Sequence, residues 1–370
     1  MMAVKRLLLV PILFLLACQH VNPKDPFSEV DRSVRAASEK GLDLPNPFVL
    51  DESIKQDVER LIRHEDMPHV RLRKALRYLH DNGFLNFEYD MSATLTAQEA
   101  FDKKRGNCLS HTGLFVALSR QLNIPTYFVY VSEALDFEER DGSYVVSSHI
   151  ATGFEDGPKT TVVDFNTERQ NFRIYERIDD RSAYCLFYNN VAVEKMMKGE
   201  YGEAEKILSF LTALKPGLKE VRNNMGVLLM KTGRYEEALD LYRDMRIASQ
   251  NYQPALHNGL LAAQRLKNKN AEDSFAASLK EISDKDPLLL YQKAIELEKS
   301  GNYEEAIVSL RKALGFQPRN AFLYGVLARL YLQNNEDVKA KTAYQRGKNL
   351  APRLSILEEL AEEHPVLLKP

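Results

Sequence analysis

The chain has almost no net charge, few cysteines and no apolar run long enough to span a membrane. Fifty basic and 52 acidic side chains leave a formal charge of −2, so no positive surplus exists to hold a phosphate backbone, and we expect no nucleic-acid partner. The apolar stretch 7–17 is interrupted by Pro11, and a hydrocarbon core needs about 20 helical residues. The sequence has neither a glycine-rich phosphate loop nor a zincin-type histidine spacing. We therefore expect no nucleotide, redox cofactor or metal.

The first 18 residues follow a signal-peptide pattern, in which Lys5 and Arg6 precede the apolar stretch and Cys18 follows it. Residues 15–18, Leu-Leu-Ala-Cys, resemble the lipobox of bacterial lipoproteins. This resemblance implies that Cys18 receives a lipid, becomes the mature N-terminus and anchors the protein to a membrane of the cell envelope. Gln19, under the sorting rule of that family, implies the outer membrane, with the protein facing the periplasm.

The length and the composition fit two folded domains behind this anchor. Hydrophobic residues make up 44% of the chain and charged residues 28%, as in folded soluble proteins. We predict a signal peptide at 1–17, a lipidated tether at 18–47, a first domain at 48–183, a repeat array at 184–352 and a closing helix at 353–370.

The first domain has the pattern of an α+β fold. Helical stretches are expected near 54–63 and 72–79, and a capping-box pair, Thr96 and Glu99, opens a short helix. The helix that begins at Cys108 has almost no polar face, so it is expected to be buried. Runs rich in β-branched and aromatic residues at 126–132, 144–154 and 160–165 predict three strands after it.

The second domain is a repeat. Nearly the same hexapeptide starts at Gly199, Gly233 and Gly301, and the alanines that close the first two copies, Ala204 and Ala238, are 34 residues apart. A degenerate copy places Ala271 near the equivalent position. The period and pattern resemble the tetratricopeptide repeat (TPR), which implies an all-α solenoid of five units whose groove binds a protein or peptide partner.

Three residues of the first domain suggest thiol chemistry. Gly106 permits a tight turn before Cys108, and a cysteine in the first turn of a helix lies where the helix dipole favours a thiolate. His149 and Asp164 fall on the second and third predicted strands, so neighbouring strands would bring imidazole and carboxylate together beside the thiol. This is the arrangement of a nucleophile, a base and an orienting acid.

Residues 96–166 resemble the transglutaminase-like superfamily, with its papain-like cysteine site. The resemblance lies in Gly-Asn-Cys at 106–108, Ser-His-Ile at 148–150 and Val-Asp-Phe-Asn at 163–166. It implies that Cys108 is the nucleophile, His149 the general base and later acid, and Asp164 the residue that fixes the imidazole tautomer. The chain departs from many relatives in having no tryptophan, so the chemistry of the substrate channel is not carried over.

Other residues near this triad leave alternatives open. The backbone N–H of Cys108 is an expected oxyanion donor, and Gln98 and Asn107 are the side-chain candidates for a second. His111 lies three residues beyond Cys108 and is expected to be a neighbour of the site rather than its base. A disulfide between Cys108 and Cys185 is the alternative to a reactive thiol.

These residues support two hypotheses of different classes. The first is an enzyme that acts on amide bonds of a protein or peptide, as a cysteine hydrolase or acyltransferase, with the repeats recruiting the substrate. The second is a lipid-anchored TPR adaptor whose first domain has no turnover, with Cys108, His149 and Asp164 as ordinary structural residues.

Overall fold

The computed structural model describes residues 27–61, 63, 66–90, 92–140, 143–156, 159–163, 175–248, 252–282, 285, 287–351 and 354–368. The expected lipidation site, Cys18, and the expected orienting acid, Asp164, therefore lie outside the described residues. Among the helices that are described, none is both long and apolar enough to cross a membrane.

The first described element corrects the expected tether. Helix α1 (Ser28–Glu39) buries Val30, Ser33 and Ala37 and packs against α6 (Asp180–Met197). Because its apolar residues recur at helical spacing, this segment has a face that a solvated tether would leave in water. The prediction of a tether for all of 18–47 is thus wrong from Ser28 onward.

Three helices, a 3-10 helix and two short strands come before one buried helix, α5. The elements are α2 (Glu52–Glu59), α3 (Pro68–Asp81), the 3-10 helix η1 (Phe84–Asn86), β1 (Glu88–Tyr89), α4 (Ala97–Lys103), β2 (Arg105–Gly106) and α5 (Cys108–Gln121). The expected capping box is present at the start of α4, with Thr96 and Glu99 bonding reciprocally. Helix α5 is buried along nearly its whole length, as its lack of a polar face predicts.

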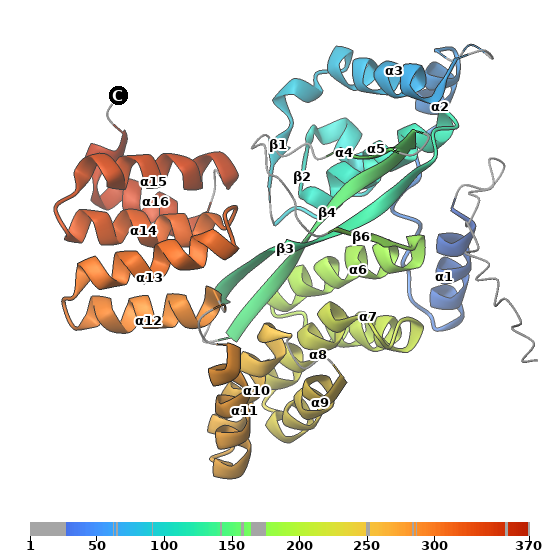
Figure 1. The fold of residues 1–370 in the computed structure, drawn as a ribbon. Coiled ribbons are helices and arrows are strands. Elements are labelled where there is room, and N and C mark those ends of the chain that lie inside the picture. Colours follow the sequence, from blue (N-terminus) through green and yellow to red (C-terminus); the bar gives the residue numbers. More distant parts are fainter. Residues whose placement is uncertain are drawn as a thin grey trace, which may run out of the picture.

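A four-stranded antiparallel sheet follows α5 in the order β5-β4-β3-β6. The strands are β3 (Thr126–Arg140), β4 (Ser143–Asp156), β5 (Lys159–Val163) and β6 (Tyr175–Ile178). The hairpin of β3 and β4 is longer than predicted and runs from beside α5 towards α10 (Gln253–Arg265) (Figure 1). Strand β6 was not predicted from the sequence.

Helix pairs make up the rest of the chain. They are α6 with α7 (Tyr201–Leu214), α8 (Lys219–Lys231) with α9 (Tyr235–Ala248), α10 with α11 (Lys269–Ile282), α12 (Pro287–Lys299) with α13 (Tyr303–Phe316), and α14 (Ala321–Gln333) with α15 (Asp337–Leu350). Helix α16 (Ser355–Glu363) and the 3-10 helix η3 (Pro365–Leu368) follow and pack on α15.

The 34-residue period is visible in the backbone. After the first helix of each pair the chain takes one residue of positive φ, at Gly199, Gly233, Lys267, Gly301 and Asn335. Glycine adopts this left-handed conformation without strain, whereas a side chain with a Cβ does not. The degenerate third unit therefore keeps the turn geometry of the others although its sequence has lost the glycine.

The first repeat is part of the N-terminal domain. One continuous core contains apolar side chains of α1, α5, the sheet, α6, α7 and α8. The guanidinium of Arg120 in α5 donates to both carboxylate oxygens of Asp180 in α6, at 2.6 and 2.8 Å. The start of α6, at Asp180, is therefore tied to α5 by this ion pair.

The hairpin also reaches the array. Strand β4 packs against α8 and α10, and the hydroxyl of Tyr130 on β3 donates to the buried carboxylate of Glu220 on α8 at 2.9 Å. The chain's own sheet therefore covers this side of α8 and α10.

Candidate functional site

The loop before α5 packs closely against the first turn of that helix. Strands β1 and β2 pair in parallel, with Tyr89 opposite Gly106. Gly106 has φ +151°, and a Cβ there would lie 2.5 Å from the Cβ of Ser110. Glycine is thus required at this position because the backbone passes directly against the first turn of α5.

Asn107 caps the helix. Its Oδ1 accepts from the N–H of Ser110 at 3.0 Å and from the Ser110 hydroxyl at 3.1 Å, and its Nδ2 donates to the hydroxyl of Thr94 at 2.9 Å. The side chain is 3% exposed. Asn107, a candidate oxyanion donor, therefore holds the helix start in place as an N-cap.

Gln98, the other candidate donor, lies on α4, and its side-chain amide is hydrogen-bonded to residues outside the site. Its Oε1 accepts from the N–H of Asp51 at 2.7 Å, and its Nε2 donates to both carboxylate oxygens of Asp102. In this structure the amides of Gln98 and Asn107 both have structural partners, so either would have to exchange them to serve an oxyanion.

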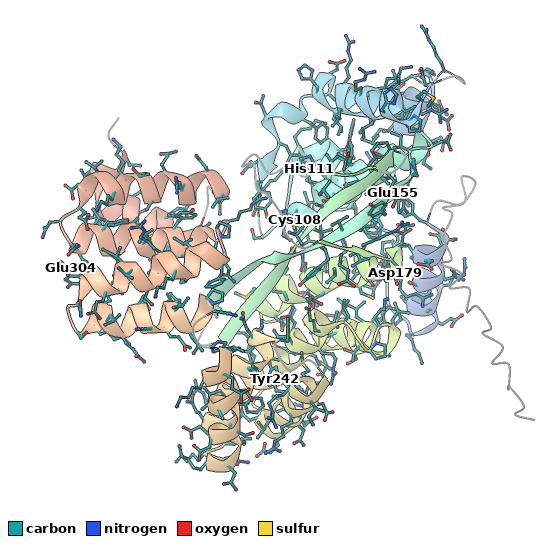
Figure 2. All side chains as sticks on the ribbon, viewed as in Figure 1. Cys108, His111, Glu155, Asp179, Tyr242 and Glu304 are labelled. Carbon is teal, nitrogen blue, oxygen red and sulfur yellow. The ribbon has the colours of Figure 1, made fainter. Side chains whose placement is uncertain are left out.

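Cys108 and His149 lie on adjoining elements. Cys108 is the first residue of α5 (Figure 2) and is half-buried. One turn further along, the hydroxyl of Thr112 donates to the carbonyl of Ile150 at 2.9 Å, and Ile150 follows His149 on β4. Residues four apart share a side of a helix, so the side of α5 that carries Cys108 faces the segment of β4 that carries His149.

The base candidate is buried beside an irregularity in the sheet. His149 is 6% exposed and pairs with Val131 on β3. The next pair is Asp136 with Ser147, so β3 contains extra residues at this point. Bulges of this kind often re-aim side chains next to active sites.

Asp164, the third member of the expected triad, lies outside the described residues. Strand β5 ends at Val163, which pairs with Thr152 on β4, and Asp164 is the next residue along the chain. The described strand thus runs beside the strand of His149 up to the residue before Asp164.

His111 lies on another side of α5. Its ring stacks on Phe87, with centroids 4.2 Å apart and planes at 21°, and it lines a hollow of about 670 Å³ together with residues of α3 and Phe84. With about 100° per residue, Thr112 and His111 flank Cys108 on opposite sides. The imidazole therefore packs towards α3, and His149 lies on the strand that Thr112 contacts.

The two described thiols differ in their surroundings. Cys185 is fully buried in α6, and this burial raises the pKa of its thiol to about 12. No disulfide joins it to Cys108. Because the thiolate is the reactive form of cysteine, Cys185 is expected to be inert at neutral pH.

Sequence reasoning missed a connection between the repeats and the site. The carboxylate of Glu194 on α6 accepts from the N–H of Thr94 at 2.9 Å, and Thr94 in turn accepts from Asn107. Burial raises the pKa of Glu194. Thr94 and Glu194 are 100 residues apart in the sequence, so no local pattern indicates the contact, although asparagine before a helix is a common cap signal.

In the part of the chain that the structure describes, no cluster of three or more histidine, cysteine, aspartate or glutamate side chains is arranged to hold a metal ion.

Comparisons with known families agree with this architecture. The family model of the transglutaminase-like superfamily matches residues 56–157, and a tetratricopeptide-repeat model matches residues 195–263 and 297–363. No curated protein matches the chain.

Solved structures of low identity match part of the chain. MamA from Desulfovibrio magneticus RS-1 is 16% identical, with 46% of this chain and 96% of that one covered at a TM-score of 0.27. A TPR protein from Thermus thermophilus is 18% identical, with 49% and 98% covered at a TM-score of 0.35. One from Parabacteroides merdae is 20% identical, with 50% and 72% covered at a TM-score of 0.32.

The two family matches follow each other along the chain in the same order as the α+β unit and the helix pairs. Tetratricopeptide repeats support protein–protein interaction. The protein therefore consists of a transglutaminase-like domain followed by a solenoid of tetratricopeptide repeats.

Proposed function

We propose that the transglutaminase-like domain is a thiol enzyme that acts on amide bonds of a protein or peptide. Cys108 is the nucleophile, His149 the base and Asp164 the residue that orients the imidazole. The observation that carries the proposal is the position of Cys108 at the start of a capped, buried helix. The side of this helix that carries Cys108 is hydrogen-bonded, through Thr112, to the residue after His149 on β4.

In the proposed reaction, His149 takes the thiol proton while the sulfur of Cys108 forms a bond to the amide carbon. The tetrahedral intermediate collapses when the carbon–nitrogen bond breaks and the imidazolium gives its proton to the leaving amine, which leaves a thioester. Water, deprotonated by His149, then breaks the thioester and returns the thiol and a carboxylic acid. An amine in place of water gives acyl transfer; we favour hydrolysis, since an exported site is bathed in water.

The oxyanion of the intermediate needs donors at the helix start. Cys108 occupies the first turn of α5, where backbone N–H groups have no acceptor within the helix. We assign its N–H as one donor, because the side chains of Gln98 and Asn107 have other partners.

The repeats and the N-terminus complete the proposal. The repeats recruit the protein substrate and raise its concentration near Cys108. Lipidation of Cys18 holds the protein on an envelope membrane, with the outer membrane facing the periplasm as the proposed location.

Thiol labelling tests the proposal. Protein without its first 18 residues is treated at neutral pH with iodoacetamide, and wild type is compared with Cys108→Ser, His149→Ala and Cys185→Ser. We expect rapid labelling that is lost with Cys108→Ser, slowed at least tenfold with His149→Ala, and unchanged with Cys185→Ser, which is the matched control. Labelling of Cys108 at the same rate with and without His149 would contradict an activated nucleophile.

A non-catalytic, lipid-anchored TPR adaptor is the second candidate, and one observation favours it: both side-chain oxyanion candidates have structural partners. The adaptor predicts that Cys108→Ala keeps the biological effect of the protein while substitutions on the repeats remove it. The enzyme predicts that Cys108→Ala removes it.

A further inference from the structure

The repeat array is interrupted between α11 and α12. Helix α8 packs along α7, α10 along α9 and α14 along α13, whereas the described residues of α11 and α12 form no comparable contact. The apolar core of α8–α11 is separate from the core of α12–α16, and among the described residues of α12 only Leu289 packs against the former. Figure 1 shows the last helix pairs as a separate stack.

The interruption exposes positions that are buried in other units. Leu289 and Leu297 of α12 are half-buried. The residues 34 positions later, Leu323 and Tyr331 of α14, are buried, as are the residues 68 positions earlier in α8, Val221 and Leu229. In α12, therefore, a face is only partly covered that is buried in the equivalent helices.

Helix α11 keeps the residues that pack on its own partner, α10. A Cβ on Gly259 of α10 would lie 2.5 Å from the ring of Phe275, just as a Cβ on Gly226 of α8 would lie 2.4 Å from the ring of Tyr242. Phe275 in α11 thus occupies the place that Tyr242 has in α9. The third unit is therefore a complete helix pair, and the interruption lies after it.

Helix α11 differs from α9 in the residues that could face a following helix. In α9 the residues three before and three after the packing tyrosine, Leu239 and Met245, are buried. The residues at the same distances from Phe275 are Glu272 and Ser278, which are only partly buried. With a carboxylate and a hydroxyl where α9 has apolar side chains, α11 offers less apolar surface than α9 to a following helix.

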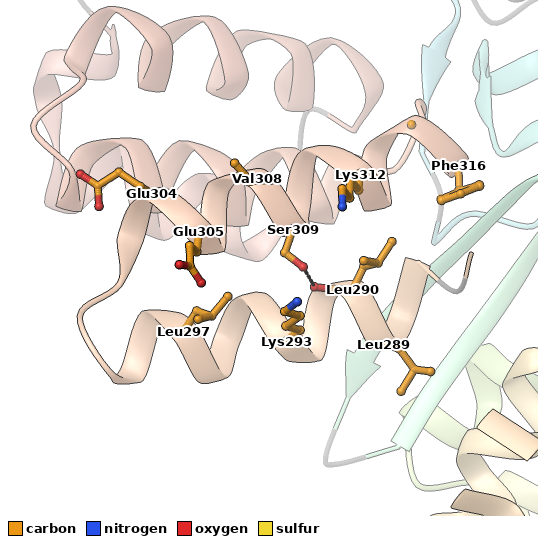
Figure 3. Close-up of a pocket in the computed structure, with 11 residues that line it drawn as sticks. Leu289, Leu290, Lys293, Leu297, Glu304, Glu305, Val308, Ser309, Lys312 and Phe316 are labelled. Carbon is orange, nitrogen blue, oxygen red and sulfur yellow. Dashed lines mark hydrogen bonds between the residues drawn. The ribbon is translucent and has the colours of Figure 1, made fainter. Parts of the chain in front are cut away.

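The open face is a hollow of about 1010 Å³ between α12 and α13 (Figure 3). Its apolar lining is Leu289, Leu290, Leu297, Val308 and Phe316. Val308 is 55% exposed and Phe316 43%. Apolar side chains gathered on one open face are typical of an interaction site.

The charges in the hollow are separated along its length. Glu304 and Glu305 lie at the end near Leu297, and Lys312 lies towards Phe316, with Lys293 between them on α12 (Figure 3). A ligand with a basic group at one end and an acidic group at the other would match this distribution.

We propose that this hollow binds an amphipathic helix of a partner protein. The apolar stripe of that helix lies between α12 and α13, with a basic residue near Glu304 and Glu305 and an acidic one near Lys312. A helix fits because equivalent faces in this array are covered by helices, and because a helix satisfies its own backbone hydrogen bonds in an apolar groove. The inference rests on the proposed recruiting role of the repeats and is independent of Cys108.

A synthetic helix tests the proposal. The probe is a fluorescent, lactam-bridged peptide with the sequence of α9, residues 235–248, the helix that packs along α10 and carries Glu236 and Glu237 in its first turn and Arg246 in its last. Its affinity for the purified protein is measured by fluorescence anisotropy. We expect binding that Val308→Glu and Phe316→Glu each weaken at least tenfold. Val338→Glu, at an 82% exposed position of α15 outside the hollow, should leave it unchanged.

A repaired array gives a second readout. The double variant Glu272→Leu, Ser278→Met restores to α11 the apolar residues that α9 carries at these positions. We expect it to pack on α12, to shrink the radius of gyration in small-angle X-ray scattering, and to weaken peptide binding at least tenfold.

Three results would overturn the proposal: no peptide binding, binding indifferent to Val308→Glu and Phe316→Glu, or a wild-type dimer that Val308→Glu dissociates, which would make a second copy the occupant. The Cys108→Ser variant should bind the peptide as wild type does. A failed peptide-binding test would therefore not contradict the proposed thiol chemistry, which the labelling of Cys108 tests separately.

Discussion

The two stacks of repeats share one period and use it differently. In the first, α6–α11, the opening helices belong to the core of the transglutaminase-like domain, and β4 covers part of α8 and α10. In the second, α12–α16, the helices have a core of their own and an open face on α12 and α13. The comparison teaches that a repeat's role depends on what covers its faces, which the period does not specify.

Hydrogen bonds join α6 of the first stack to segments of the transglutaminase-like domain, including the loop before Cys108. The hydroxyls of Tyr184 and Tyr188 on α6 donate to the carbonyls of Leu44 and Pro45, and Glu194 holds the loop that precedes α5. A partner that shifts α6 would therefore also shift the cap of Cys108. No equivalent polar contact joins the described residues of α12–α16 to that loop in this structure.

The largest predicted effect comes from cutting the chain at either stack. A chain ending at residue 178 loses α6, which supplies part of the shared core, and we expect it not to fold. A chain ending at residue 286 loses only the second stack and should keep a cooperative unfolding transition and iodoacetamide labelling of Cys108. Circular dichroism and labelling check both, and a stable domain ending at 178 would contradict the shared core.

Breaking a buried ion pair of the first stack should cost more unfolding free energy than breaking a partly exposed pair of the second. The Arg120 side chain is 2% exposed, and breaking a buried pair by removing one partner costs about 3–5 kcal/mol. We expect that loss of unfolding free energy for Asp180→Ala. Arg329→Ala, which breaks a more exposed pair with Glu298, should cost about 1 kcal/mol. Urea unfolding measures both, and equal losses would remove the distinction.

At the left-handed turn positions, the effect of a substitution on stability should depend on the residue type and not on the stack. Lys267 adopts φ +53° where other units have glycine, and a residue with a Cβ pays about 1 kcal/mol in this region. Lys267→Gly should therefore stabilise the protein by about that amount, and Gly233→Ala should destabilise it similarly. Asn335→Gly should change little, since asparagine tolerates this conformation. Thermal unfolding of the three variants checks the order.

The smallest predicted effect is a change in how the free energy of unfolding depends on pH, caused by Glu220 at the contact between the hairpin and α8. Burial raises the pKa of Glu220, with Lys219, Tyr130 and Glu176 also acting on it. A raised folded-state pKa stabilises the fold below the unfolded pKa, and this contribution is lost as pH rises through the folded pKa.

Glu220→Gln should therefore flatten the decline in stability towards neutral pH. Urea unfolding between pH 5 and pH 8 measures it, with Glu236→Gln, an exposed position of α9, as the control. Parallel pH profiles for wild type and Glu220→Gln would show that this carboxyl does not titrate in the folded range.

Local patterns predicted much of the fold. The capping box at Thr96, the buried helix from Cys108 and the 34-residue period all depend on residues a few positions apart. Helix α1 was missed although its apolar residues recur at helical spacing, because the prolines and polar residues of 18–47 suggested a tether. Strand β6 was missed because it is defined by a distant partner, β3. The side-chain partners of Gln98 and Asn107 were also out of reach, since they come from other loops.

By itself, the sequence determined the order of the two modules, the position of the thiol at a helix start and the glycine turns at Gly199, Gly233 and Gly301. These features follow from backbone preference and hydrophobic periodicity, which act over a few residues. Only the tertiary structure decided that the first repeat belongs to the core of the first domain, that Glu194 supports the loop before Cys108, and that the array is open at α12. Such contacts join residues far apart along the chain, and the packing of whole faces selects them.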